Sequence, residues 1–566
     1  MTAQAWQSGF RAPKVDIHDF SMIPRADIPR SKFRMQHQFK TTLNAAQLTP
    51  IYIQEILPGD TFNVKMTAFC RLATPLFPLM DNCDLETFFF FVPNRLVWIH
   101  WKQFMGEQNS PADSISYSIP QITSPVGGFT DSVYDNFGCP MTGQVAGGNT
   151  VSVNALPLRC YNLIWNEWFR DQNLQNGTGF GSTNGIGYGG SAVMDDGPDP
   201  STNYTMLSVN KRHDYFTSCL PWTQKGGAVT TPLQGQATVK TASSDLITGA
   251  QNAMLLRQAT AGANFGTGFS WMSTGVPAQI ALSTTAATQT GGTSTAYPTN
   301  LYADLTTATA TTINALRLAF QTQRLLERDA RGGTRYTEIV RSHFGVTSPD
   351  SRLQRPEYLG GGKTPITVSA IPQTTQTGLT GGTTPLGTLG GMGTAVANHG
   401  YNGSFTEHGY VIGLATARTD EIYQQGLRKL WSRLTRYDFY FPAFAMLGEQ
   451  AVLNKEIYTD GSANDALTFG FQERWGELRY HPSRTGVFFR STHATPLDAW
   501  HLGTKFTGLP SLNAAFIQSP LATTLNRNLA LAGGSAGQQI LCDFLFTENC
   551  ARPIPMYSVP GMIDHF

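Results

Sequence analysis

The chain has 566 residues, a formal net charge of +1 and only 14% charged residues. A chain so close to neutral cannot hold a polyanion through its overall charge, so any contact with nucleic acid has to come from local basic patches. Low charge together with 56 glycines and 32 prolines argues against a helical bundle and favours strands joined by long loops. So little exposed charge also predicts a surface that other chains partly cover, and hence an oligomer.

The seven cysteines contain no CxxC pair, which predicts free thiols in a reducing cytoplasm and no metal site. No stretch approaches the ~20 apolar residues of a membrane span. The N-terminus lacks the basic-then-apolar order of a signal peptide. We therefore expect a soluble protein that is made in the cytoplasm and needs no cofactor.

Residues 1–48 show little hydrophobic periodicity and are interpreted as an extended N-terminal arm. Seven Lys and Arg residues and three Asp residues stand between Met1 and Lys40. Such a segment becomes ordered on a neighbouring chain or an inner surface, or it is an ordinary solvated terminus. The sequence leaves both interpretations open.

Residues 49–225 are predicted to form the first part of a β-sandwich. Ile51–Leu57 and Phe62–Ala73 flank a Pro-Gly-Asp turn, and the second segment alternates apolar with polar side chains, as a half-buried strand does. The aromatic run Leu85–Val92 is typical of a strand that is buried on both faces. Leu156–Leu174 carries its apolar side chains at helical spacing, which predicts a helix that packs on the core.

Residues 226–310 form an insertion of different character. Only four charged residues occur in it, and Thr, Ala and Gly dominate. A structureless loop of this length inside a compact domain is improbable, so we expect a small module or a functional projection. Its bulky side chains Phe265, Phe269 and Trp271 either contact a receptor or pack the base of the projection.

Residues 311–566 are predicted to form the second part of the sandwich, with long loops. An Arg-rich stretch opens this part, with eight Arg and four acidic residues between Arg317 and Arg355. Glycine and proline divide the stretch, so we expect one helix that ends near Arg331 and another over Tyr336–Phe344. The stretch offers contacts to DNA or to another subunit, and its interspersed acids favour ion pairs between subunits. The candidate residues are Arg331, Arg335, Arg341, Arg352 and Arg355.

Further strands are expected after the neutral stretch Thr364–Thr406, which itself is predicted to be a long surface loop. Many short strands separated by long loops fit an eight-stranded jelly-roll sandwich, so the predicted fold class is mainly β with a few short helices. The segments concerned are Tyr410–Thr416, Phe439–Phe444, Phe469–Trp475, Val487–Phe489 and Gln539–Phe546.

A second basic group has four cations within nine residues and no acid, next to several aromatic residues. Phosphates attract such cations and bases stack on the rings, so the group could bind a single-stranded nucleic acid. Subunit interfaces are enriched in the same residue types, and we favour an interface. The candidate residues are Arg428, Lys429, Trp431, Arg433 and Arg436.

The sequence GGGKT at Gly360–Thr364 approaches the pattern of a phosphate-binding loop. The full pattern needs Gly at Glu357, and Pro365 follows where a helix would have to begin. We therefore interpret the segment as a turn. No HExxH, Cys/His cluster or GxSxG motif occurs, so no catalytic residue is predicted and the chain is not expected to be an enzyme.

Six blocks of sequence resemble the major capsid protein of the gokushoviruses, which are small tailless single-stranded DNA phages of the Microviridae. The blocks keep their order, and the resemblance extends along nearly all of the chain outside three Gly/Thr-rich gaps. They are EILPGDTF (55–62), FVPNRLVW (91–98), NLIWNEWFRDQNL (162–174), KRHDYFTSCLPWTQKG (211–226), ERDARGGTRYTEIVRSHFGVTSPDSRLQRPEYLGGGKTPI (327–366) and the terminal residues 560–566.

This resemblance implies a structural protein with a viral jelly roll that self-associates into a T=1 icosahedral shell of 60 copies. The shell would enclose a circular single-stranded DNA genome, and the insertion at 226–310 would form a protrusion at the threefold axes that serves host attachment. The implied partners are the DNA genome, a small basic DNA-binding protein, an internal scaffolding protein, a pilot protein and a host surface receptor. The virion would be assembled in the cytoplasm of the bacterial host.

Two other classes of protein share parts of this pattern. A secreted adhesin or surface-array protein would have similar Gly/Thr-rich loops and low charge, but it needs an export signal. A nucleotide-binding or hydrolytic enzyme needs a complete motif, and the one partial match fails.

Overall fold

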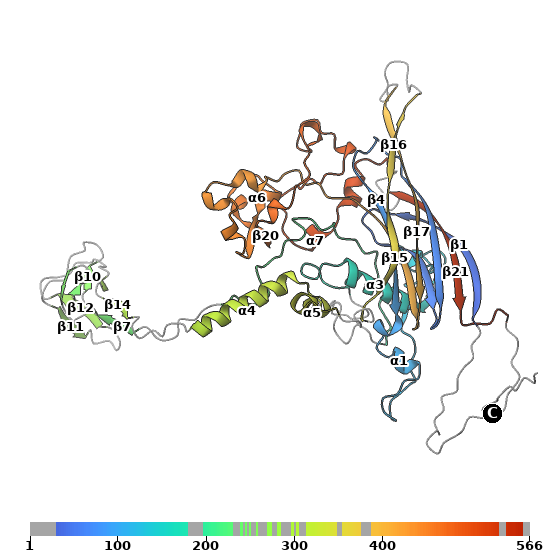
Figure 1. Ribbon diagram of the computed structural model, residues 1–566, viewed down its shortest axis with the longest axis horizontal. Helices are drawn as coiled ribbons and strands as arrows, with labels where there is room; N and C mark the ends of the chain where they lie inside the picture. The colour runs from blue at the N-terminus through green and yellow to red at the C-terminus, as the bar shows by residue number, and fades with distance from the viewer. Residues whose placement is uncertain are drawn as a thin grey trace, which may run out of the picture. The chain divides into compact units, whose positions relative to one another are not determined.

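The computed structural model describes residues 30–178, 196–229, 313–347, 354–374, 387–530 and 539–557, together with short strands between residues 238 and 304 (Figure 1). The chain divides into two compact units. Gln224–Arg331 forms one unit, and Met1–Thr223 with Gly332–Phe566 forms the other. In the described part of the chain, no helix is both long and apolar enough to cross a membrane.

The larger unit is built on two antiparallel sheets. One has five strands in the order β1-β21-β3-β17-β16, and the other has four in the order β15-β4-β18-β2. Without β16, this is the strand order of an eight-stranded jelly roll with two Greek keys, so the predicted fold class is confirmed. The strands are β1 (Ser31–Leu43), β2 (Thr49–Ile56), β3 (Thr61–Leu72), β4 (Asp84–Pro93), β15 (Glu357–Pro365), β16 (Thr367–Pro372), β17 (Leu389–Ser404), β18 (Gly409–Arg418) and β21 (Ile540–Arg552).

The core lies between the two sheets and is rich in aromatic rings. β3 buries every second side chain, as its alternating sequence predicts. The ring of Tyr52 on β2 lies 5.0 Å from that of Phe546 on β21, and Phe89 on β4 lies 5.2 Å from Tyr401 on β17. These contacts join one sheet to the other, and ring pairs at such distances add to the free energy of burial.

The two central strands of the four-stranded sheet, β4 and β18, are buried on both faces. Nearly every residue of β4 and β18 is buried, because α3 (Leu156–Ile164) packs on these two strands from the side opposite the core. A π-helical turn over Trp165–Phe169 continues α3. The helix predicted at Leu156–Leu174 is therefore confirmed as far as Phe169, and the doubly buried strand predicted at Leu85–Val92 is confirmed.

A fully buried ion pair fixes α3 to the chain around it. The Nε atom of Arg159 donates to the Asp199 carboxylate at 2.7 Å, and both side chains are inaccessible to solvent. The hydroxyl of Tyr204 donates to the same carboxylate. These donors satisfy the hydrogen-bonding capacity that a buried carboxylate would otherwise fill with water.

The boundary predicted for the N-terminal arm has to be corrected. Ser31–Leu43 lies within the segment assigned to the arm, but it forms the 13-residue strand β1, which pairs along its length with β21. Phe33, Met35 and Phe39 alternate with polar residues and pack on the core. The alternation of apolar and polar residues that indicates a strand was therefore present in this part of the sequence. Residues 1–29 lie outside the described residues, and an arm there stays a prediction.

Two predictions about the glycine-rich middle of the chain are wrong. Gly360–Thr364 is no turn but part of β15, and Thr364–Thr406 is no loop, because β16 and β17 lie within it. A Cβ atom on Gly360 would lie 2.6 Å from the carbonyl oxygen of Gly400 in β17, and one on Gly361 would overlap the carbonyl oxygen of Thr87 in β4. The glycines thus permit close strand packing where the two sheets meet.

Only some of the other predicted strands are confirmed. Tyr410–Thr416 and Gln539–Phe546 are confirmed within β18 and β21. Phe469–Trp475 is a strand, β20 (Thr468–Glu473), but it pairs with β19 (Glu449–Leu453) in a separate two-stranded sheet. Phe439–Phe444 and Val487–Phe489 are not strands, since short 3-10 turns occupy them. A short apolar run does not by itself distinguish a strand from other structures.

The remaining elements of the larger unit are short apart from α5 (Tyr336–Phe344), which confirms the second helix predicted in the Arg-rich stretch. The others are α1 (Trp101–Phe104), β5 (Gln121–Thr123), α2 (Ser132–Asn136), β6 (Ser152–Asn154), α6 (Asn454–Ile457), α7 (Ala514–Ile517) and α8 (Leu521–Leu525).

The smaller unit, Gln224–Arg331, consists of short strand pairs and the helix α4 (Ile313–Arg331), which ends where the sequence predicts. Phe269 and Trp271 lie on β11, while Phe265 lies outside the described residues. That this insertion projects outward stays a prediction. Its strands are β7 (Thr238–Thr241), β8 (Ser244–Asp245), β9 (Thr248–Ala250), β10 (Leu256–Gln258), β11 (Phe269–Ser273), β12 (Ile280–Thr284), β13 (Ala296–Pro298) and β14 (Leu301–Asp304).

The close packing of β15 yields a first prediction. Gly361 has a φ of +152° and faces the backbone of β4, so Gly361→Ala is expected to lower the free energy of unfolding by about 3 kcal/mol or more. Gly508→Ala is the control, because no atom lies within 4 Å of its added Cβ. Chemical denaturation of both variants measures the difference, and equal midpoints would contradict the role given to Gly361.

Candidate interaction surfaces

Residues 428–447, here called the arginine–aromatic loop, carry the second basic group of the sequence. The loop consists of short 3-10 turns at Lys429–Ser432, Arg436–Asp438 and Pro442–Phe444. Asp438 fixes its middle, since the backbone N–H groups of Thr435 and Leu434 donate to this carboxylate and lower its pKa. A loop held in this way keeps one shape without regular secondary structure.

The arginine–aromatic loop exposes an unusual amount of apolar surface. Trp431 is 70% exposed, Leu434 90% and Met446 96%. Large side chains that are this exposed, and this close in sequence, form the kind of patch that marks a contact with another molecule. The others are Leu430, Tyr437, Phe439, Tyr440, Phe441 and Leu447.

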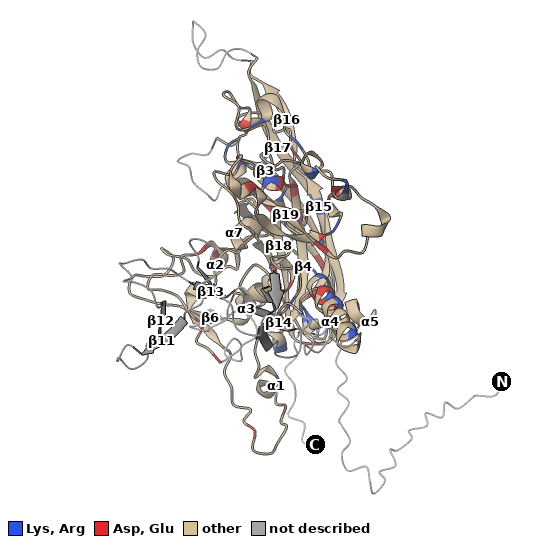
Figure 2. Ribbon diagram, turned by 90° about the vertical axis from the view of Figure 1, so that its left-hand side faces the viewer, with Lys and Arg blue, Asp and Glu red and all other residues tan. Residues whose placement is uncertain are grey.

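Two cations of this loop are neutralised by the chain itself. Lys429 lies 3.7 Å from the carboxylate of Glu456, and Arg433 lies 3.3 Å from that of Glu477. Burial raises the pKa of Glu456, and the charge of Lys429 opposes this shift. Figure 2 shows basic and acidic residues close together on the loops around β19. The loop is therefore less basic in three dimensions than in sequence.

Two arginines of the loop lie over aromatic rings. The guanidinium of Arg436 lies over the ring of Phe441 at 5.3 Å, and that of Arg433 lies over Phe439 at 5.7 Å. Arg436 is exposed and Arg428 is half-buried. Arginine stacked on an aromatic ring loses little freedom on binding, which suits a contact with another protein chain.

Two arginines of the first basic stretch are committed to contacts within the chain. Arg335 binds Glu167 through its Nε atom at 2.8 Å and Glu338 through Nη1 at 3.0 Å, and it also donates to the Glu167 carbonyl oxygen. Arg355 lies over the ring of Trp168 at 4.7 Å. Both therefore hold the π-helical turn Trp165–Phe169, and the contact with DNA or another subunit that the sequence suggests for them stays a prediction.

The structure separates the rest of that stretch. Arg331 is the last residue of α4 in the smaller unit, and Arg341 lies exposed on α5 in the larger one. Arg352 lies outside the described residues. The described arginines of the stretch thus belong to different elements, and a shared role in binding DNA or another subunit stays a prediction.

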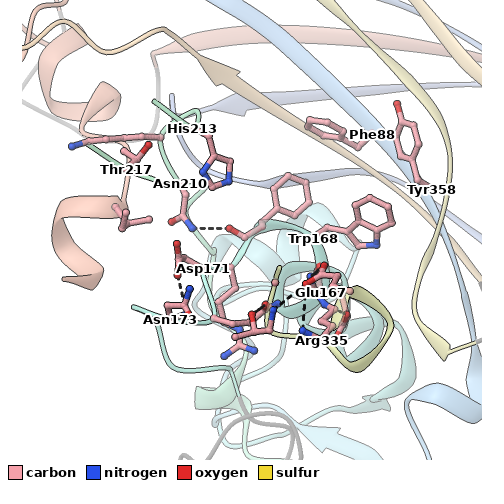
Figure 3. A pocket seen from close by; sticks show the side chains of 18 of the residues that line it. Phe88, Glu167, Trp168, Asp171, Asn173, Asn210, His213, Thr217, Arg335 and Tyr358 are labelled. Atoms are coloured by element: carbon pink, nitrogen blue, oxygen red, sulfur yellow. Dashed lines mark hydrogen bonds and ion pairs between the residues drawn. The ribbon is translucent and has the colours of Figure 1, made fainter. Parts of the chain in front are cut away.

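A pocket of about 590 Å³ opens beside the turn Trp165–Phe169 (Figure 3). Phe88, Trp168 and Tyr358 form an aromatic wall, while Asn210 and His213 lie across from it. The side chain of Asn210 donates to the carbonyl oxygen of Phe169 at 2.8 Å. One wall offers ring stacking and the other offers hydrogen bonds, so the pocket can accept a planar group or an aromatic side chain.

The lysine of the GGGKT segment has a structural partner. Lys363 lies 2.9 Å from the carboxylate of Asp84 on the neighbouring strand β4. An extended strand aims its N–H groups at other strands rather than at a phosphate, so this segment cannot cradle a nucleotide.

The family to which the chain belongs follows from comparison with known proteins. The family model described as "Capsid protein (F protein)" matches residues 21–562. The chain belongs to this capsid protein family. The resemblance to gokushovirus major capsid proteins is therefore confirmed.

Three relatives match almost the whole length of this F-family capsid protein, and each is called capsid protein VP1. That of Bdellovibrio phage phiMH2K is 44% identical over 97% of this chain and 98% of its own. That of Chlamydia phage 1 is 39% identical over 98% and 99%, and that of Spiroplasma virus 4 is 36% identical over 96% and 98%. The chain is a structural capsid protein of a Microviridae-type phage, and as such it is part of a virion shell.

The contacts of Arg335 yield a second prediction. Glu167 is almost completely buried, so Arg335→Ala leaves a carboxylate without its cation and is expected to lower the free energy of unfolding by about 3 kcal/mol. Arg341→Ala on the exposed side of α5 is the control, with an expected change within about 0.5 kcal/mol. Thermal and chemical unfolding of the soluble chain measure both. A stable Arg335→Ala subunit that fails to assemble would instead place Arg335 at an interface.

Proposed function

We propose that the chain is the subunit of a T=1 icosahedral shell of 60 copies that encloses a circular single-stranded DNA genome. The observation that carries this proposal is the match to three phage capsid proteins over at least 96% of the chain. The jelly-roll sandwich supports it, since this fold is common among shell-forming proteins. The role is structural, and no catalytic function is assigned.

The arginine–aromatic loop is the main subunit contact in this proposal. Its cations are partly neutralised by Glu456 and Glu477. The loop therefore presents mainly aromatic and aliphatic surface to a partner. Burial of such side chains at the centre of an interface typically dominates the free energy of association. The same surface has little net charge to offer a genome, so an interface is favoured over DNA binding.

Genome neutralisation needs other molecules as well. A subunit with a net charge of +1 balances few phosphates, so counter-ions and a small basic DNA-binding protein are proposed to supply the remainder. An internal scaffolding protein and a pilot protein complete the proposed set of partners, and assembly takes place in the cytoplasm of the bacterial host. Residues 1–29 are proposed to act as an internal arm.

The insertion is proposed to be the host-attachment element. Gln224–Arg331 is a compact unit by itself, which supports a role separate from the shell-forming sandwich. Its strands are short and its residues 226–310 include only four charged ones, as suits a surface projection that binds a receptor by shape and hydrogen bonds.

The assembly proposal predicts that Trp431→Asp combined with Leu434→Asp abolishes shell formation while the soluble subunit keeps its unfolding midpoint. Both side chains are exposed in the subunit, but each would bury a charge at an interface. Co-expression with the scaffolding protein, followed by sedimentation, measures the yield of shells. Val126→Asp with Met80→Asp is the control, since these side chains are similarly exposed outside the loop. Normal shells from the loop variant would refute the assignment.

The attachment proposal predicts that deletion of residues 234–306 leaves shells that form but adsorb to host cells much less. The measurement is the fraction of particles that sediment with cells, compared with particles of the full chain. Unchanged adsorption would exclude the insertion as the receptor-binding element. Loss of all soluble protein would show that the insertion is needed for folding.

A further inference from the structure

The five-stranded sheet has one buried face and one exposed face, and the exposed face is basic. Its inner face carries Phe62, Val64 and Met66, which are buried in the core. The side chains between them point outward and are exposed. Figure 1 shows α3, α6 and α7 on the side of the sandwich away from β1 and β21, so none of them covers this face.

The outward side chains of this face, here called the sheet face, include five cations and one carboxylate. The carboxylate is Asp543 on β21, to which Gln38 donates at 2.7 Å and near which Lys40 lies at 4.0 Å. The strand positions that point outward thus carry a net charge of +4 in a chain whose total is +1. The cations are Lys32, Arg34 and Lys40 on β1 and Lys65 and Arg71 on β3.

Strand register places these cations among amides. Arg34 lies opposite Asn549, which lies opposite Asn63, and Asn402 follows on β17. Neighbouring strands are about 4.8 Å apart, so each such row forms a continuous line of side chains. Gln36, Gln38 and Asn398 add further amides, each of which can both donate and accept hydrogen bonds.

Most of these cations have no counter-charge of their own. Among the residues that the structure describes, Lys32, Arg34, Lys65 and Arg71 make no ion pair within 4.0 Å. This differs from the arginine–aromatic loop, where Lys429 and Arg433 are paired. Like charges on one open face repel each other, and a polyanion that covers them removes this cost and releases counter-ions.

We propose that the sheet face is the surface of the capsid protein that lies against the single-stranded DNA, so that the five-stranded sheet faces the interior of the shell. This inference rests on the proposed function, in which the shell encloses such a genome. Cations contact phosphates, and amides bind sugars and base edges without a fixed sequence. Phe69 is 53% exposed in the middle of the face and offers a ring on which a base can stack.

A second copy of the chain is a poorer occupant of this face. A surface with a net charge of +4 does not complement itself. The arginine–aromatic loop concentrates nine exposed large apolar side chains in 20 residues, as a tight subunit contact needs. The sheet face also exposes large apolar side chains, but they are spread over four strands among the cations and amides; they are Phe69, Ile371, Met392, Val396, Leu541 and Leu545.

The test uses the purified full-length chain and fluorescent oligo(dT), with the salt concentration varied. In the sheet variant, Lys32→Gln, Arg34→Gln and Lys65→Gln are combined. The control variant combines Arg479→Gln, Arg484→Gln and Arg490→Gln, which removes the same charge from exposed loops. If each sheet cation meets a phosphate, the slope of log K against log salt falls by about 2 in magnitude in the sheet variant and stays unchanged in the control.

A companion variant tests stacking. Phe69→Ala is expected to weaken oligo(dT) binding about tenfold with no change in the salt slope, because it removes a ring and no charge. Equal unfolding midpoints of all variants ensure that binding is compared between folded proteins.

Three outcomes would overturn the inference. Equal salt slopes for the sheet variant and the unchanged chain would exclude phosphate contacts on this face. A smaller salt slope in the control variant would place the DNA on the loops. Polyglutamate serves as a second ligand in the same assay. If the sheet variant loses polyglutamate binding but retains oligo(dT) binding, the occupant of this face is an acidic protein. The proposed function is tested separately, by measuring whether purified particles contain DNA that is protected from nuclease. The proposed function and the inference about the sheet face can therefore fail independently.

Discussion

Strand β21 lies between β1 and β3, and the rest of the structure depends on this pairing. Residues near the C-terminus must align with two strands near the N-terminus over twelve or more positions. The sandwich therefore closes only when the whole chain is present. The pairing of β1 with β21 fixes the two ends of this scaffold to each other. Segments between β4 and β21 that do not belong to the two sheets are therefore insertions into it. Contacts so distant in sequence are entropically costly to form, which predicts slow folding.

This scaffold assigns different roles to its two sheets. The central strands of the four-stranded sheet are buried on both faces, because α3 packs on β4 and β18. The five-stranded sheet keeps one open face, and its outward cations are largely unpaired. Insertions such as the arginine–aromatic loop carry the most concentrated exposed apolar area. Association between subunits and contact with a polyanion can thus use separate surfaces, so that a change in one need not weaken the other.

Sequence patterns predicted the strands that alternate clearly, such as β3, and those with a continuous aromatic run, such as β4. They missed β17, because a strand of Gly, Ala and Asn has low β propensity and is held by close backbone packing that only the fold supplies. They misassigned Val487–Phe489, because a short apolar run has no period by which to identify it.

The contacts of the candidate residues within the chain were harder to predict than the fold. Arg335 and Arg355 were named as contact residues, but each has a partner in its own chain that sequence spacing does not reveal. The basic character of the sheet face is equally hidden, since Lys32 and Lys65 belong to strands that become neighbours only through β21. Clusters of charge along a sequence are thus a weak guide to clusters of charge in space.

The central claim is that apolar side chains exposed in one subunit are covered in the shell. Hydroxyl-radical oxidation of purified particles and of dissociated subunits, read at Trp431 and Met446 by mass spectrometry, tests it most directly. The account predicts that both side chains react readily in the subunit, where they are 70% and 96% exposed, and are strongly protected in the particle. Equal oxidation in both states would contradict the claim and remove the arginine–aromatic loop from the subunit interface.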